Sequence, residues 1–236
     1  MWLVFVDETS DTKYKDYFGL SVAIVNASFY PKIKREAQRI LIEGGWDPSV
    51  EFKGSCLFSA SKGCTNVSVD KRVELASDLL ELNVANKNRR MKFYYVTMTS
   101  NNHKADYLKH LPLLLKKGLP KASSKPGKDL LCVTCDQRSD IQTLEIHNSI
   151  NSIVYERGYV IFEQVTMAAS GFNTVGLLYA DIVGYLVSRI DNISRDVDLF
   201  DSIPPECFES NGRVKKLKSS TTLISKVKRL SLFEVR

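Results

Sequence analysis

The first ten residues, MWLVFVDETS (residues 1–10), decide how the rest of the sequence is interpreted. Residues 2–6 are all apolar and mostly favour β-structure, and Asp7 and Glu8 end the run. Many α/β enzymes hold a metal ligand at the end of a buried strand, because a rigid strand fixes the carboxylate in place. A strand that runs into an ordinary polar turn has the same pattern. The interpretation therefore depends on further acids that arrive in the same way.

Composition and charge narrow the class of protein. The 236 residues are 44% hydrophobic and 25% charged, which are globular values and argue against wholesale disorder. The net charge of +6 favours a polyanionic partner such as nucleic acid, although many basic proteins bind nothing anionic. The apolar runs are too short for a membrane span or a signal peptide. Five cysteines, an odd number, predict reduced thiols and a cytoplasmic location.

The apolar pattern predicts strands that alternate with helices after an initial hairpin. This order predicts a three-layer α/β sandwich rather than a doubly wound nucleotide-binding fold, whose glycine fingerprints are missing from the sequence. Strands are expected at residues 2–6, 18–25, 93–98, 130–135 and 159–165, and helices at 31–42, 69–82, 104–117, 141–156 and 173–189.

No domain break is predicted before about residue 191. We therefore expect one domain over residues 1–190, followed by a basic C-terminal extension, residues 191–236, packed on or beside it. Residues 213–229 of this extension hold seven Lys or Arg and no acid, and residues 116–128 hold five lysines and no acid. Such segments can follow the phosphates of a nucleic acid, and they can equally form a solvated basic face.

Asp136 repeats the opening pattern, because it follows the apolar run LLCVTC at residues 130–135. The ends of neighbouring strands in one sheet lie about 5 Å apart, so Asp7 and Asp136 converge if their strands are neighbours. Asp181 lies inside an apolar helical segment, residues 176–190, and is expected to face the protein. A buried carboxylate there needs a metal, another cation or a proton. A bond to a lysine or a backbone amide is the equal alternative.

Glu51 is a fourth candidate, with Lys53 beside it, although a solvated loop acid is an equally good interpretation. Three or four carboxylates without a histidine cluster suit Mg²⁺ or Mn²⁺. Two such ions can activate water and stabilise the leaving oxygen in phosphodiester hydrolysis. The sequence thus favours a metal-dependent nuclease or related phosphoesterase acting on DNA or RNA. The alternative is a catalytically silent, nuclease-like module that binds nucleic acid or a protein partner.

At these residues the chain resembles the domain-of-unknown-function 3800 family of the ribonuclease H-like superfamily, over roughly residues 1–190. The matching pieces are Asp7-Glu8-Thr9, where the family usually has Asp-Glu-Ser, then Glu51-Phe52-Lys53-Gly54, Asp136, and residues 180–185, ADIVGY. Gly176 and Leu177 also fit the last motif, whereas Leu178 and Tyr179 replace its usual glutamine and leucine. The resemblance implies a ribonuclease H-like three-layer sandwich with a mixed central sheet and flanking helices.

The resemblance also suggests a role for each acid. Asp7 would bridge two metal ions or anchor the first, while Asp136 and Asp181 complete the coordination and Glu51 is the fourth ligand. Glu8 is expected to point to the opposite face of its strand, because adjacent strand residues do so. Lys53 would contact a phosphate or hold a carboxylate. The predicted substrate-binding residues are Lys53, Lys121, Lys125 and Lys128.

Overall fold

The computed structural model describes residues 1–10, 15–58, 67–84, 91–122, 129–200, 223, 226–227, 229–230 and 232–235. Its strands are β1 (Trp2–Ser10), β2 (Tyr17–Asn26), β3 (Lys92–Thr99), β4 (Asp129–Asp136), β5 (Tyr159–Ile161), β6 (Thr166–Ala168) and β7 (Leu232–Glu234). Its helices are α1 (Tyr30–Glu43), α2 (Val69–Val84), α3 (His103–Gly118), α4 (Thr143–Glu156) and α5 (Val175–Phe200), with a 3₁₀ helix, η1 (Gly54–Cys56).

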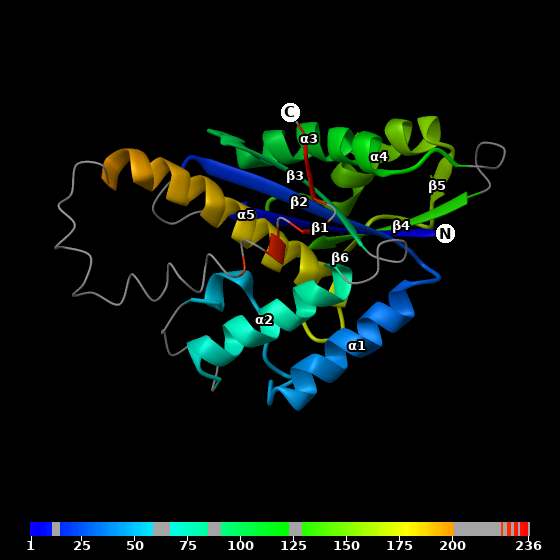
Figure 1. The fold of residues 1–236 in the computed structure, drawn as a ribbon. Coiled ribbons are helices and arrows are strands. Elements are labelled where there is room, and N and C mark those ends of the chain that lie inside the picture. The colour runs from blue at the N-terminus through cyan, green and yellow to red at the C-terminus, as the bar shows by residue number, and fades with distance from the viewer. Residues whose placement is uncertain are drawn as a thin grey trace.

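The strands form one mixed sheet in the order β5-β4-β1-β2-β3-β7, and β6 also pairs with β4. β1, β2 and β3 are antiparallel neighbours, whereas β4 runs parallel to β1. Helices cover both faces of the sheet: α3 and α4 lie on one side and α1, α2 and α5 on the other (Figure 1). The predicted three-layer α/β sandwich with a mixed central sheet and flanking helices is confirmed.

Strand alternation explains how β1 serves both layers. Val4 and Val6 pack with α3 and α4, and Phe5 packs on the other face with α5. Asp7 is two residues after Phe5 and therefore leaves β1 on the α5 side. β2, the next strand, is buried along almost its whole length, as expected for a central strand with both faces covered. The sheet thus delivers the first acid toward α5.

Three elements differ from the sequence prediction. The strand expected at residues 159–165 is two short strands, β5 and β6, separated by a turn in which Glu163 has a φ of 58°. β1 continues through Asp7 and Glu8 to Ser10, beyond the expected end at residue 6, so these acids lie within the strand. α5 continues to Phe200, beyond the expected end at residue 189. The division at residue 190 falls inside this helix and stays a prediction.

Residues near the C-terminus contact the rest of the chain. Leu223, Val227 and Leu230 are buried in the core that contains α1, α2 and α5. Lys226 Nζ lies 3.4 Å from Glu81 Oε2 on α2. β7 pairs in parallel with β3 at the edge of the sheet. Described parts of the C-terminal region therefore contribute to both the core and the sheet.

The cysteines only partly match the expectation of reduced thiols. Cys132 and Cys135 are free, but Cys56 is disulfide-bonded, so the expectation is wrong at that position. A cytoplasmic location stays a prediction. Within the described ranges, none of the helices has the length and apolar character needed to cross a membrane.

Candidate active site

Asp7 and Asp136 lie side by side on two neighbouring strands, Asp7 within β1 and Asp136 at the end of β4. β1 and β4 pair in parallel with Val6 opposite Cys135, so the next residue of each strand is an aspartate. Asp7 is buried, with 6% of its surface exposed, and its carboxyl group shares a hydrogen bond with that of Asp136. Asp136 Oδ1 also accepts a hydrogen bond from the Ser170 backbone N–H at 3.2 Å. The predicted convergence of these two acids is therefore observed.

Two glycines let α5 approach the sheet closely enough to bring Asp181 to these acids. A Cβ at Gly176 would lie 2.2 Å from a ring carbon of Phe5, so no side chain fits between the helix and β1. A Cβ at Gly184 would lie 2.8 Å from Thr9 Oγ1 and equally close to a hydroxyl on β2. At these two glycines, the backbone of α5 packs directly against side chains of the strands. Asp181 is located between them.

A backbone amide orients the Asp181 carboxylate. The Gly54 N–H, at the start of η1, donates a hydrogen bond to Asp181 Oδ2 at 2.8 Å. A Cβ at Gly54 would lie 3.0 Å from Asp181 Oδ1 and 2.6 Å from Tyr185 Cβ, so a side chain does not fit at residue 54. One of the two alternatives for Asp181, a bond to a backbone amide, is therefore observed. The same contact brings the segment with Glu51 and Lys53 to the cluster.

Lys53 is the cation of this cluster. Its Nζ lies 2.9 Å from Glu51 Oε2. This hydrogen bond raises the pKa of Lys53, and the charges of Asp181 and Asp136 add to the effect. Of the two roles predicted for Lys53, the pairing with a carboxylate is observed. The contact with a phosphate stays a prediction. Glu51 is partly buried rather than a freely solvated loop acid, with 29% of its side chain exposed.

Burial and like charge perturb the acids. Burial raises the pKa of Asp7 well above its usual range, and the charges of Asp181 and Asp136 raise it further, while Lys53 opposes them. Burial also raises the pKa of Asp181 to about 7, although the Gly54 N–H bond lowers it. Burial and like charge therefore favour the protonated form of Asp7, and Asp181, with a pKa of about 7, titrates near neutral pH. The cluster has more negative groups than its one lysine can balance.

The chemistry of this donor set fits a hard divalent cation, because every candidate ligand is a carboxylate oxygen and the crowded acids repel one another. The side chains are not yet arranged as a cage. Across the residues that the structure describes, no group of three or more Asp, Glu, His or Cys side chains is positioned to hold one metal ion. Binding would therefore require a closer approach of the carboxylates.

Asp7 and Asp136 open onto a cavity of about 310 Å³. It lies at the C-terminal end of β4, beside residues 6–8 of β1. Open α/β sheets commonly bind ligands at such a position. The other lining residues are Val6, Glu8, Tyr107, Gln137, Arg138, Ser139 and Asp140. Asp7 and Asp136 therefore border a space that a substrate group can enter, whereas Asp181, Glu51 and Lys53 are not among the residues that line it.

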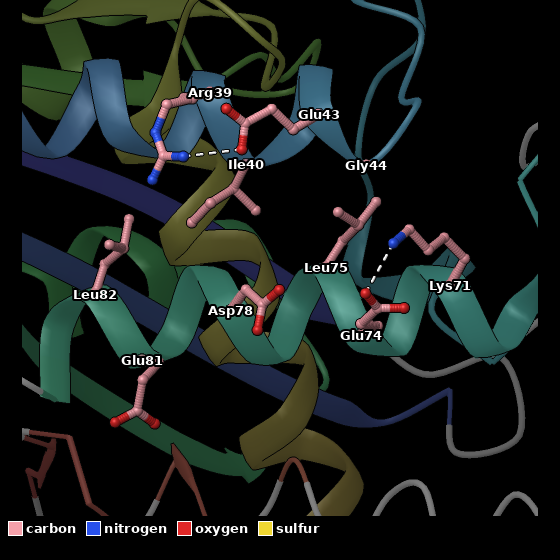
Figure 2. A pocket seen from close by; sticks show the side chains of 10 residues that line it. All are labelled: Arg39, Ile40, Glu43, Gly44, Lys71, Glu74, Leu75, Asp78, Glu81 and Leu82. Atoms are coloured by element: carbon pink, nitrogen blue, oxygen red, sulfur yellow. Dashed lines mark hydrogen bonds and ion pairs between the residues drawn. The ribbon is translucent and has the colours of Figure 1, made fainter.

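A larger hollow of about 520 Å³ lies between α1 and α2 and contains none of the predicted site residues (Figure 2). Its rim charges pair with one another: Arg39 with Glu43 at 2.8 Å, and Lys71 with Glu74 at 2.7 Å. Size alone therefore does not locate the chemistry in this molecule.

Glu8 points away from the acid cluster, as predicted. Its carboxylate forms an ion pair with Arg138 and lies 3.2 Å from His103 Nδ1 at the start of α3. Arg138 also binds Asp140 at 2.7 Å and lies over the ring of Tyr107, 4.8 Å from its centre. The sequence analysis missed this network and the Ser170 contact. The position of Arg138, two residues after Asp136, was the available signal.

The predicted lysine contacts do not gather around the acids. Lys121 is exposed beyond the C-terminal end of α3, and Lys125 and Lys128 lie outside the described residues. β4 begins at Asp129 and ends at Asp136, a span of about 23 Å at ~3.3 Å per residue. The loop that contains these lysines therefore joins the sheet at the end opposite to Asp136. Their role in substrate binding stays a prediction that needs an extended substrate.

Comparisons with known proteins give no family. No family model matches the chain, and no curated protein matches it. One similar solved structure is a chain of the complex of PCNA and RNase HII from Archaeoglobus fulgidus, with a TM-score of 0.47 and 10% identity over 98% of this chain and 93% of that one. Another is ribonuclease H2 from Pyrococcus horikoshii, with a TM-score of 0.43 and 10% identity over 97% and 99%. The resemblance to the domain-of-unknown-function 3800 family stays a prediction.

Proposed function

We propose that this protein is a metal-dependent nuclease, or a related phosphoesterase, that hydrolyses phosphodiester bonds in nucleic acid. The observation that supports this most is that Asp7, Asp136 and Asp181 lie near enough for their charges to shift one another's pKa, although they come from two strands and a helix far apart in the sequence. Glu51 is the fourth candidate ligand. The net charge of +6 suits a polyanionic substrate.

In this proposal, bound Mg²⁺ or Mn²⁺ would activate water and stabilise the leaving oxygen. The chain's own groups orient the ligands: the Ser170 N–H fixes Asp136, and the Gly54 N–H fixes Asp181. Lys53 offsets part of the negative charge through Glu51 and is half-exposed, so its ammonium group is able to meet a phosphate. The cavity beside Asp7 admits the reacting part of the substrate.

One observation favours the alternative of a silent module that binds nucleic acid without cutting it. Asp181 is already bonded to a backbone amide, and the described acids do not form a ready cation cage. A protein that had lost catalysis could keep such contacts for stability alone. Metal-dependent cleavage separates the two functions.

The test is a cleavage assay on labelled single-stranded, duplex and hybrid nucleic acids in Mg²⁺, Mn²⁺ or EDTA. We expect cleavage that requires a divalent cation and falls by at least about 100-fold in Asp7→Asn, because the substitution removes a ligand charge and leaves the shape. The matched control is Asp78→Asn, an exposed helical aspartate on α2, which should cleave normally.

Three outcomes of this assay are informative. Cleavage lost only in Asp7→Asn supports the nuclease. Metal-dependent cleavage that survives in Asp7→Asn contradicts the assigned site. No cleavage by any variant, together with salt-sensitive binding of nucleic acid by wild type and Asp7→Asn alike, identifies the silent module instead.

A further inference from the structure

Ser21 lies on β2 directly opposite Asp7 of β1 and is 98% buried, with 2% of its surface exposed. Its one hydroxyl proton is donated to the carbonyl oxygen of Ala180 at 2.8 Å, and the carbonyl oxygen of Asp7, at 3.3 Å, is the weaker acceptor of the same bifurcated bond. Ala180 immediately precedes Asp181 on α5. One hydroxyl therefore connects the backbone at both acids.

The packing around Ser21 leaves the hydroxyl little freedom. A Cβ at Gly184 would lie 2.8 Å from Ser21 Oγ and 3.2 Å from Ser21 Cβ, so the missing side chain of Gly184 makes room for the serine. The next residues of β2 on the same face, Ala23 and Val25, are apolar and belong to the core. An apolar side chain would avoid the desolvation of a hydroxyl at this position. Core packing alone therefore does not explain why this position has a hydroxyl group.

We infer that Ser21 is a positioning residue that fixes the separation between Asp7 and Asp181, and thereby the affinity of this pair for a divalent cation. The inference rests on the proposed function. Groups that orient metal ligands from behind typically change metal affinity by 10- to 100-fold when they are removed. Ser21 acts on the backbone of one ligand and on the residue beside the other, so we expect an effect near the lower end of that range.

The test measures Mn²⁺ binding by calorimetry to the wild-type protein and to the Ser21→Ala, Ser21→Thr and Ser149→Ala variants. Ser149 is the control because its hydroxyl also donates to a backbone carbonyl, that of Ile146 at 2.7 Å, but on α4 across the sheet. We expect Mn²⁺ to bind about 10-fold more weakly to Ser21→Ala and with unchanged affinity to Ser149→Ala. Ser21→Thr keeps the hydroxyl and should bind within about twofold of the wild type.

Urea unfolding of the same variants separates a specific effect on the metal ligands from a general loss of protein stability. Ser21→Ala and Ser149→Ala each lose one hydroxyl-to-carbonyl bond, so their midpoints should shift by similar amounts while only the first loses Mn²⁺ affinity. If Ser21→Ala does not fold, Ser21→Cys replaces it, because a thiol is a weak donor of similar shape. Equal Mn²⁺ affinity in Ser21→Ala and the wild type overturns this inference and leaves the proposed function standing. A wild-type protein that binds no Mn²⁺ overturns both.

Discussion

The Asp181→Asn variant should be more stable than the wild type by about 3–4 kcal/mol at about pH 8.5 in EDTA, and by only about 1–2 kcal/mol at about pH 5. Burial raises the pKa of Asp181 from 3.8 to about 7. The protonated form is thus favoured by folding. Its stabilising contribution is complete below the unfolded pKa and is lost as the pH rises through the folded pKa. Asparagine is neutral at every pH and keeps an oxygen that can accept the Gly54 N–H bond.

Urea unfolding in EDTA at the two pH values checks this prediction. The control is Asp78→Asn, another helical aspartate but exposed beside the α1–α2 hollow (Figure 2), which should change stability little at either pH. Added Mn²⁺ should stabilise the wild type at high pH by mass action and have much less effect on Asp181→Asn. If Asp181→Asn is less stable than the wild type at high pH in EDTA, the carboxylate is a structural group and not a strained ligand.

Gly176→Ala should destabilise the protein by about 3 kcal/mol, because overpacking a filled core typically costs ~1–3 kcal/mol and here the new methyl group meets an aromatic ring. A Cβ at residue 176 would lie 2.2–2.3 Å from three ring carbons of Phe5. That ring stacks on Tyr30, with 5.2 Å between ring centres, so it is hemmed in on its other side. In an ordinary helix interior, replacing glycine with alanine stabilises the protein by up to ~1 kcal/mol. A loss of stability in Gly176→Ala would therefore indicate a steric clash.

Chemical denaturation of Gly176→Ala and Gly171→Ala measures the effect. A Cβ at Gly171 would meet only Thr174 Oγ1, at 4.0 Å, so this control should unfold near the wild-type midpoint. Since α5 carries Asp181, Gly176→Ala should also weaken Mn²⁺ binding. A Gly176→Ala protein as stable as the wild type would contradict the close packing of α5 on β1.

The candidate acids were predictable from the sequence, and their partners were not. Asp7 and Asp136 each follow an apolar run, and that local signal identified both, while their convergence depended on whether their strands are neighbours. The bond from Gly54 to Asp181 joins residues 127 positions apart. The Ser21 bond to Ala180 spans 159 positions. Such contacts depend on which strand pairs with which, and no local pattern encodes that.

The basic loop shows a different limit of sequence analysis. Residues 116–128 precede β4 in the sequence, and Asp136 follows it, so they are close along the chain. A β-strand is extended, however, so the residues before it and after it lie far apart along the strand direction. The prediction that these lysines bind substrate rested on their charge, which does not say how far they lie from Asp136. The long helix α5 and the split strand β5–β6 were misjudged for a related reason, because tertiary packing sets where such segments end.

Anomalous X-ray scattering from crystals grown with Mn²⁺ at about pH 8 tests the central claim most directly, since burial favours protonation of Asp7 and Asp181 and a higher pH favours the charged carboxylates that bind a cation. We expect a manganese peak about 2.2 Å from carboxylate oxygens of Asp7 and of Asp136 or Asp181, a distance usual for oxygen ligands of small divalent cations. The peak should disappear in Asp7→Asn. Absence of a peak at Asp7, at a Mn²⁺ concentration where the protein cleaves nucleic acid, would contradict the assignment of this acid cluster as the catalytic metal site.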